Sequence, residues 1–472
     1  MSTATTISNT GTRETGAPDA SDYARPTARV HFGVFYSGVG PGVDWTAPDA
    51  IDQIDFEAFR KVAQVAERGL FDAFFFGEGL RLREHLEKLI ELNVAGRPDS
   101  QVALAAIAAV TTRIGIVATQ NATYHEPFDL ARRLATLDIL SGGRAAWNIV
   151  TTVNEWTGEN FRRGGWVAVP DRYTHAEANV RLVRALWDAG QNLDIATRRD
   201  AEQWGRTGTR VTGDGDFAQV SATATVPPSP QGHPVLFQSG DSDGGRDLAA
   251  RQADVIFSRH VEIQDALKFA ADIRRRVEAA GRPADDVLIL PGGGFILGAT
   301  EDEAQEKARW RQQVTWTDQH IVQFVEKSYG RELPELDPDG PLPDFDPEIQ
   351  EISVEGGTVG HYLTPKQVVD NWRAISAEHG FTSIRQLVLH LGSERAHIGT
   401  PAQIADELAH AVRSGAYDGI NLGLSHVPAG LDDIVNTLIP ELQERGVYPA
   451  EYIGTTLREH LGLRPPLTRR TA

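Results

Sequence analysis

The sequence predicts an α/β fold, and within that class a closed (β/α)8 TIM barrel, from three observations. From Val30 onward, short β-rich runs alternate with longer runs of helical periodicity, a pattern typical of parallel strands joined by helices. Eight strand and helix units follow one another in this way. A chain of 472 residues fits one barrel with insertions better than two unrelated domains. A doubly wound parallel sheet is the alternative fold.

The first four units occupy the N-terminal half of the chain. Residues 30–36 place every second apolar side chain on one face, as a strand does. Residues 71–76 are too uniformly apolar for a half-exposed strand, so we expect that strand to be buried on both faces. A helix between these two strands ends at Gly69. The following elements are expected as helix, strand, helix, strand and helix at 102–110, 113–119, 128–140, 144–150 and 171–187.

The last four units are separated by two insertions. The expected strands lie at 235–239, 254–258, 287–290 with a continuation to 297, and 418–424, and the helices at 248–252, 263–280, 401–413 and 431–444. Insertions of about 190–230 and 301–398 follow strands four and seven. We therefore expect a disordered tail at 1–27, a single barrel domain at 28–462 and a C-terminal tail at 463–472.

The larger insertion is expected to form a lid. It starts at the carboxyl end of a barrel strand, which is the face where barrel active sites lie. Its segment 333–347 is rich in Pro and acidic residues, which favours an exposed, mobile stretch. His320 and His361 belong to this insertion, and they are our candidates for catalytic acid or base residues.

Composition excludes several classes of function. The chain has 46 Lys and Arg against 65 Asp and Glu, a net charge of −19, which argues against nucleic acid or an anionic membrane as the partner. It has no Cys, so disulfides, a thiolate nucleophile and zinc–thiolate sites are excluded. The longest apolar run, 102–110, is too short for a membrane span. Residues 1–27 resemble no signal peptide, and we expect a cytoplasmic protein without a metal site.

Polar, mostly uncharged residues follow the expected strands. Since the carboxyl ends of barrel strands meet on one face, we expect these residues to line a common site. They are Glu78, Thr119, Gln120, Asn121, Tyr124, Asn148, Thr151, Thr152, Gly240, Asp241, Ser242, His260 and Asn421.

The turn QSGDSDGGR at 238–246 is the sharpest local signal. Its glycines and Ser242, placed between a strand and a helix, can form a phosphate cradle at the helix start. The same residues match the G-x-S-x-G nucleophile elbow of α/β-hydrolases, with Ser242 as the nucleophile. A plain capped turn is the third interpretation. The spacing alone leaves all three open.

Several runs resemble the flavin-dependent monooxygenases of the bacterial luciferase-like superfamily. They are ATQNATYHEP at 118–127, LSGGR at 140–144, WNIVTT at 147–152, DRY at 171–173 and QSGDSDGGRD at 238–247. More narrowly, they resemble the branch of nitrilotriacetate, dibenzothiophene-sulfone and long-chain-alkane monooxygenases. The resemblance runs from about Val30 to Tyr452.

The resemblance implies a luciferase-like barrel that uses reduced FMN (FMNH2) and O2. It implies a separate NAD(P)H:flavin reductase as partner, insertion of one oxygen atom into a small organic substrate through a flavin hydroperoxide, and a homodimer or homotetramer. Glu78 stands where the family usually has Asp at the flavin, and Val169 stands where it usually has His. The residues implied to bind FMN are Glu78, Thr119, Asn121, Asn148, Thr152, Tyr173, Gly240, Asp241 and Ser242.

Two alternative functions remain open. The first is a serine hydrolase that uses Ser242, and the second is a non-catalytic barrel that binds flavin or deazaflavin. The sequence leaves the substrate and the bond that is oxygenated open.

Overall fold

A computed structural model gives the fold. It describes residues 28–36, 54–82, 84–85, 88–89, 98–152, 155–162, 171–190, 209–216, 218–347, 364–393, 396–424 and 429–466. The expected tail at 1–27, His361, Val169 and part of both insertions lie outside the described residues.

Eight parallel strands close into a barrel, as the sequence predicts. They pair in the order β10, β9, β6, β5, β2, β1, β13 and β11, and pairing of β10 with β11 completes the circle. The strands are β1 (His31–Tyr36), β2 (Ala73–Phe76), β5 (Gly115–Asn121), β6 (Ala145–Val150), β9 (Val235–Gln238), β10 (Val255–Ser258), β11 (Leu288–Leu297) and β13 (Gly419–Gly423). This excludes the doubly wound sheet, whose edges stay open.

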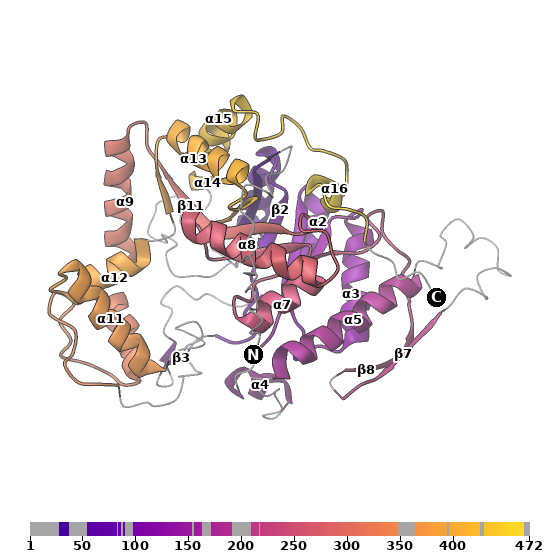
Figure 1. Cartoon of the computed structure of the whole chain (residues 1–472), viewed down its shortest axis with the longest axis horizontal. Coiled ribbons are helices and arrows are strands. Elements are labelled where there is room, and N and C mark those ends of the chain that lie inside the picture. Colours follow the sequence, from indigo (N-terminus) through magenta and orange to yellow (C-terminus); the bar gives the residue numbers. More distant parts are fainter. Residues whose placement is uncertain are drawn as a thin grey trace, which may run out of the picture.

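Helices surround the barrel (Figure 1). They are α1 (Phe56–Arg68), α2 (Ser100–Val110), α3 (Pro127–Leu140), α5 (Arg172–Gly190), α7 (Asp243–Gln252), α8 (Ile263–Ala279), α13 (Pro401–Ser414), α14 (Ala429–Asp433) and α15 (Ile439–Glu444). The short helix α4 (Glu155–Arg162) and the two-residue strands β3 (Glu84–His85) and β4 (Lys88–Leu89) belong to loops that follow barrel strands. None of the helices in the described ranges combines the length and the apolar character needed to cross a bilayer.

One expected helix is interrupted. The run at 431–444 forms α14, a π-helical turn at Ile434–Leu438 and α15. Pro440 lies in the first turn of α15. Proline lacks an N–H and its ring displaces the carbonyl one turn earlier, so the helix accommodates it by widening before Pro440.

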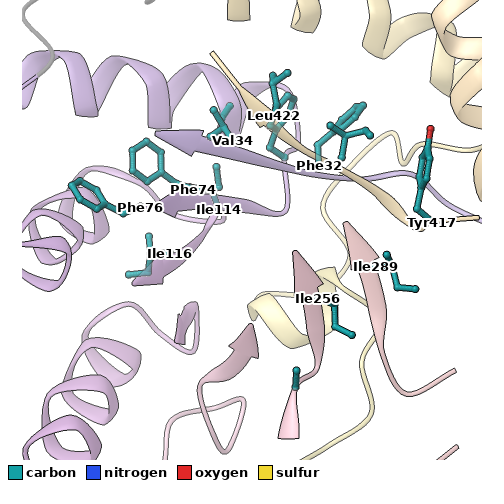
Figure 2. Close-up of a cluster of buried hydrophobic side chains, with 14 of the residues drawn as sticks. Phe32, Val34, Phe74, Phe76, Ile114, Ile116, Ile256, Ile289, Tyr417 and Leu422 are labelled. Carbon is teal, nitrogen blue, oxygen red and sulfur yellow. The ribbon is translucent and has the colours of Figure 1, made fainter. Parts of the chain in front are cut away.

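Alternation along the strands separates an outer from an inner core. Phe32, Val34, Phe74 and Phe76 belong to the cluster between strands and helices, and Figure 2 shows them among its buried side chains. The inner cluster fills the barrel itself. Leu457 and Leu461, in and just after α16 (Leu457–His460), belong to that inner cluster. The described residues therefore include a helix that closes one end of the barrel.

Four phenylalanine rings pack together inside the barrel. Phe75 lies 5.5 Å from Phe35, 5.7 Å from Phe237 and 5.8 Å from Phe257, measured between ring centroids. Phe35 and Phe257 stack at 6.0 Å with an interplanar angle of 4°. We call these four residues the phenylalanine layer. It makes this part of the barrel interior apolar, because the faces and edges of aromatic rings line it.

The first insertion contains a hairpin. The strands β7 (Arg210–Asp214) and β8 (Gln219–Thr223) pair antiparallel between α5 and β9. The position after the fourth barrel strand agrees with the sequence prediction.

The second insertion is helical and has its own core. It contains α9 (Glu301–Thr315), α10 (Asp318–Tyr329), α11 (Pro365–His379) and α12 (Ile384–Ser393), and it ends at the strand β12 (Ala396–Gly399), which pairs with β11. The last three helices share a cluster around Tyr329 and Trp372. The insertion follows β11, the seventh barrel strand, as predicted.

The segment 333–347 has many exposed residues, as expected, and it also contacts the helices of the insertion. Leu333, Leu336 and Leu342 pack on the insertion core. Arg385 binds Asp339 at 2.7 Å, and Arg373 donates to the Phe345 carbonyl at 2.7 Å. Its acidic residues Asp339 and Asp346 are ion-pair partners of Arg385 in α12 and Arg373 in α11, and its mobility stays a prediction.

Candidate active site

The polar residues at the ends of β5 and β6 meet inside the barrel. Val117 belongs to the inner cluster, so Thr119, two residues later, points to the same side. The Asn148 side chain donates to the Thr119 hydroxyl at 3.0 Å. Both residues are only 4% exposed. The Asn148 Oδ1 atom is buried and has no hydrogen-bond partner among the described residues.

Asn121 and Thr152 form a second pair beside the first. The Asn121 amide donates to the Thr152 hydroxyl. The Asn121 Oδ1 atom accepts from the Thr123 backbone N–H at 2.8 Å, which fixes the orientation of the amide. The structure thus brings together four of the residues that the sequence predicted as a site.

Glu78, two residues after β2, turns toward the start of α2. Its Oε2 atom accepts from the Ser100 backbone N–H at 3.1 Å and from the Gln120 side chain at 2.9 Å, and the Ser100 hydroxyl also binds it. Gln120 follows Thr119 and therefore lies on the outer side of β5. The carboxyl group sits between the barrel wall and α2, and Ser100 is a partner that the sequence analysis missed.

Burial controls the protonation of Glu78. Loss of solvent raises the pKa of this carboxyl from 4.5 to about 7, although the hydrogen bonds from Ser100 lower it. Near neutral pH the group is therefore divided between its acid and carboxylate forms. Such a group can donate or accept a proton at working pH.

Tyr173 and Ser242 form a hydroxyl pair at the start of α7. The Ser242 hydroxyl donates to Tyr173 Oη at 2.9 Å, and Arg172 donates to the same Oη atom at 3.1 Å. Ser242 is the N-cap of α7, and it accepts from the Gly245 backbone N–H at 3.3 Å. Tyr173 comes from α5, so the pair joins two helices.

The close approach of Tyr173 requires glycines in this turn. A Cβ atom on Gly240 would lie 3.0 Å from Tyr173 Oη and 2.4 Å from the Gln238 side-chain nitrogen. A Cβ atom on Gly244 would lie 2.7 Å from the Tyr173 ring. The missing side chains leave backbone exposed beside two hydroxyl groups at a helix start.

The arrangement does not support Ser242 as a hydrolase nucleophile. A serine nucleophile needs a histidine base within hydrogen-bond distance. In the described structure the side-chain partner of Ser242 is Tyr173. His260, the histidine after the next strand, instead binds Asp241 and Asp265.

Asp241 is a structural ion-pair centre of the turn. It binds Arg259 at 2.8 Å, Arg246 at 2.9 Å and His260 at 3.3 Å. Burial raises the pKa of its carboxyl, but the hydrogen bonds from His260 and Arg246 outweigh burial and hold that pKa well below the usual range. Its side chain is therefore committed to these cations, which leaves the backbone of Asp241 for any ligand.

Of the two candidate catalytic histidines, the structure describes only His320, and it does not join this group. His320 lies in α10, and its Nδ1 atom is 2.8 Å from the Thr315 carbonyl oxygen. This contact keeps the ring at the helix start, within the insertion. His361 lies outside the described residues, so its part in a site stays a prediction.

Comparisons with known proteins identify the family. Residues 30–418 match the model of the luciferase-like monooxygenase family. The chain is 33% identical to N-acetyl-S-(2-succino)cysteine monooxygenase of Bacillus subtilis (strain 168), over 93% of this chain and 98% of that protein. It is 33% identical to nitrilotriacetate monooxygenase component A of Aminobacter aminovorans, over 92% of this chain and 95% of that protein.

A solved riboflavin lyase, determined with modified FMN and riboflavin, has a TM-score of 0.73 at 27% identity, covering 93% of this chain and 96% of that one. The fold, the family model and these relatives confirm the resemblance seen in the sequence. The chain belongs to the luciferase-like monooxygenase family.

Proposed function

We propose that this protein is a two-component monooxygenase that receives reduced FMN from a separate NAD(P)H:flavin reductase and inserts one atom of O2 into a small organic substrate. The observation that carries the proposal is the Tyr173–Ser242 hydroxyl pair over the glycine turn at the start of α7. Reduced FMN would supply the two electrons that activate O2.

The turn has the properties that a phosphate group needs. The N-terminus of a helix of ten residues offers backbone N–H groups and a partial positive charge. The hydroxyl groups of Ser242 and Tyr173 add two donors that can turn toward an anion. Two arginines, Arg246 and Arg259, balance the charge of Asp241, so the phosphate would not face an uncompensated carboxylate.

The flavin ring would lie at the mouth above the phenylalanine layer. Asn148 Oδ1 and Gln238 Oε1 are buried without a partner among the described residues, and buried acceptors of this kind need a donor from a ligand or water. Thr119, Asn121 and Thr152 would orient the ring through polar contacts. The phenylalanine layer would keep water from the reacting centre. Glu78, whose carboxyl lies between the barrel wall and α2, would act on the flavin site through Gln120 at the end of β5.

The names of the relatives support the two-component arrangement and leave the substrate open. One relative is named as component A of a nitrilotriacetate monooxygenase, which supports a second protein that reduces the flavin. Another is named for N-acetyl-S-(2-succino)cysteine, and the structural neighbour was solved with modified FMN. We further propose a cytoplasmic homodimer or homotetramer.

Substitution of Ser242 by Asp tests the phosphate site. Asp keeps the N-cap but adds a negative charge where the phosphate would bind. Thr317→Asp is the matched control, because Thr317 is the N-cap of α10 in the insertion. We expect S242D to weaken binding of oxidised FMN at least tenfold in a calorimetric titration and T317D to leave it unchanged. Equal FMN affinity in S242D and the wild type would contradict this site.

Turnover tests the need for a reductase. With NADH, FMN and this protein alone, we expect no oxygen consumption above the background of the cofactors. Addition of an NADH:FMN reductase should start flavin-dependent oxygen consumption. Oxygen consumption that is equally fast without a reductase would rule out the two-component arrangement.

A further inference from the structure

The insertion helix α9 carries an arginine on its inner face. This helix packs on β11 and β12, and its buried residues are Ala304 and Ala308. Arg311 follows Ala304 by seven positions, so it continues the same stripe of the helix. Trp310, one position earlier, is 53% exposed and marks the solvent side. In Figure 1, α9 stands beside the barrel and leads toward α12.

Arg311 is half-buried and, within the described ranges, forms no hydrogen bond and no ion pair. Burial lowers the pKa of its guanidinium to about 10, and no carboxylate of the described residues raises it again. Two other arginines of the insertion are paired with carboxylates. Arg373 binds Asp346 at 2.8 Å, and Arg385 binds Asp339 at 2.7 Å.

A partly desolvated charge without a partner is unfavourable. The chain has 65 acidic residues, and the described ones leave this guanidinium unpaired. The insertion begins at the carboxyl end of β11, on the same face of the barrel as Thr119, Asn148 and Ser242. The helix α9 follows β11 on that face, so a ligand bound there would have to reach the inner side of α9 to supply the missing negative charge.

We propose that Arg311 is a specificity-determining residue that binds a carboxylate of the substrate, so that the substrate is a small organic acid. A guanidinium group matches a carboxylate with two parallel hydrogen bonds. This inference rests on the proposed monooxygenase function, for which it names the substrate class. It assigns the insertion a direct role in substrate choice.

Binding by two acids tests the role of Arg311. The probes are nitrilotriacetate and N-acetyl-S-(2-succino)cysteine, each compared with its methyl ester and titrated calorimetrically into the full chain with oxidised FMN present. The variant is Arg311→Gln, and the matched control is Arg309→Gln, which alters an exposed arginine of the same helix. We expect at least one acid to bind the wild type and R309Q equally. We expect R311Q to bind that acid about ten- to a hundredfold more weakly, the range for a charged hydrogen bond.

Three results would overturn the proposal: neither acid binds the wild type, R311Q binds the acid as tightly as the wild type, or the ester binds as tightly as the acid. Direct FMN titration separates this test from that of the proposed function. We expect R311Q to bind FMN as the wild type does. A wild type that fails to bind FMN would refute the flavin site, whereas the acid titrations in flavin-free protein would still report on Arg311.

Thermal unfolding gives a second measurement that needs no ligand. Because Arg311 carries an uncompensated charge, Arg311→Met should raise the midpoint of thermal unfolding, and Arg309→Met should leave it nearly unchanged. Addition of a bound acid should then stabilise the wild type and not R311M. A lower midpoint for R311M would show that Arg311 serves the fold and would refute the binding role.

Discussion

Replacement of Glu78 by Gln should remove a pH-dependent loss of unfolding free energy. The pKa of Glu78 rises from 4.5 to about 7 because the carboxyl is buried, with hydrogen bonds from Ser100 opposing the rise. The native state therefore binds the proton more tightly than the unfolded state does. As the pH rises from 4.5 to about 7, the folded protein loses stability, and above about 7 the loss is complete.

The magnitude follows from the difference of about 2.5 between the two pKa values. At about 1.4 kcal/mol for each pKa unit, the wild type loses about 3 kcal/mol of unfolding free energy over this range. Gln has nearly the same shape and stays neutral, so E78Q should avoid the loss. At pH 5 the two proteins should be similar in stability, and at pH 8 the variant should be the more stable one.

Thermal unfolding of the flavin-free protein between pH 5 and pH 8 measures this difference. Glu306→Gln, an exposed change on α9, is the control and should follow the wild type. Infrared difference spectra should show a protonated carboxyl in the wild type at pH 6 that E78Q lacks. If the midpoints of E78Q and the wild type stay parallel from pH 5 to pH 8, the buried, proton-binding Glu78 described above is refuted.

Three further substitutions test the ion pair of Asp72, the barrel interior and the second insertion. Burial raises the pKa of Asp72, but the charge of His31 and its hydrogen bond lower that pKa below the usual value. The stabilisation by the Asp72 carboxylate is therefore present above pH 4 and is lost in acid. Asp72→Asn should cost about 3 kcal/mol of unfolding free energy in urea at pH 7, and equal unfolding midpoints would exclude this. Phe75→Ala should cost about 3 to 5 kcal/mol through the cavity it leaves in the phenylalanine layer, and a loss below about 1 kcal/mol would contradict that packing. Arg385→Ala removes the bond to Asp339 and should increase hydrogen peroxide released per reduced flavin, measured with a peroxide probe; an unchanged ratio would separate this segment from the site.

The barrel could be predicted because each strand is encoded locally. Residues such as Phe32 and Val34 alternate toward the outer core, and the glycines at 142 and 143 end a helix at positive φ. Parallel strands bring their carboxyl ends together, so the meeting of Thr119 with Asn148 followed from topology. The widened turn before Pro440 was not foreseen, although a proline in the interior of the expected helix at 431–444 is a signal for such an interruption.

Side-chain direction and pairing could not be predicted in the same way. The sequence places Glu78 at a strand end, but only the fold brings Ser100 and Gln120 to its carboxyl group. Arg311 looks like any other arginine of a charged helix until its surroundings are known. The ion pairs of the acidic segment 333–347 were not foreseen, because its partners Arg373 and Arg385 lie in helices that come later in the chain.

The closing helix α16 has a consequence for synthesis of the protein. β1 pairs with β13, and Leu457 and Leu461 complete the inner cluster of the barrel. The partners of the first strand are therefore synthesised last, after every other barrel strand. Until then the nascent barrel exposes apolar side chains such as Val117 and Val255 at its open end. Such intermediates are prone to aggregation, and expression of this protein should therefore depend on chaperones more than its native stability suggests.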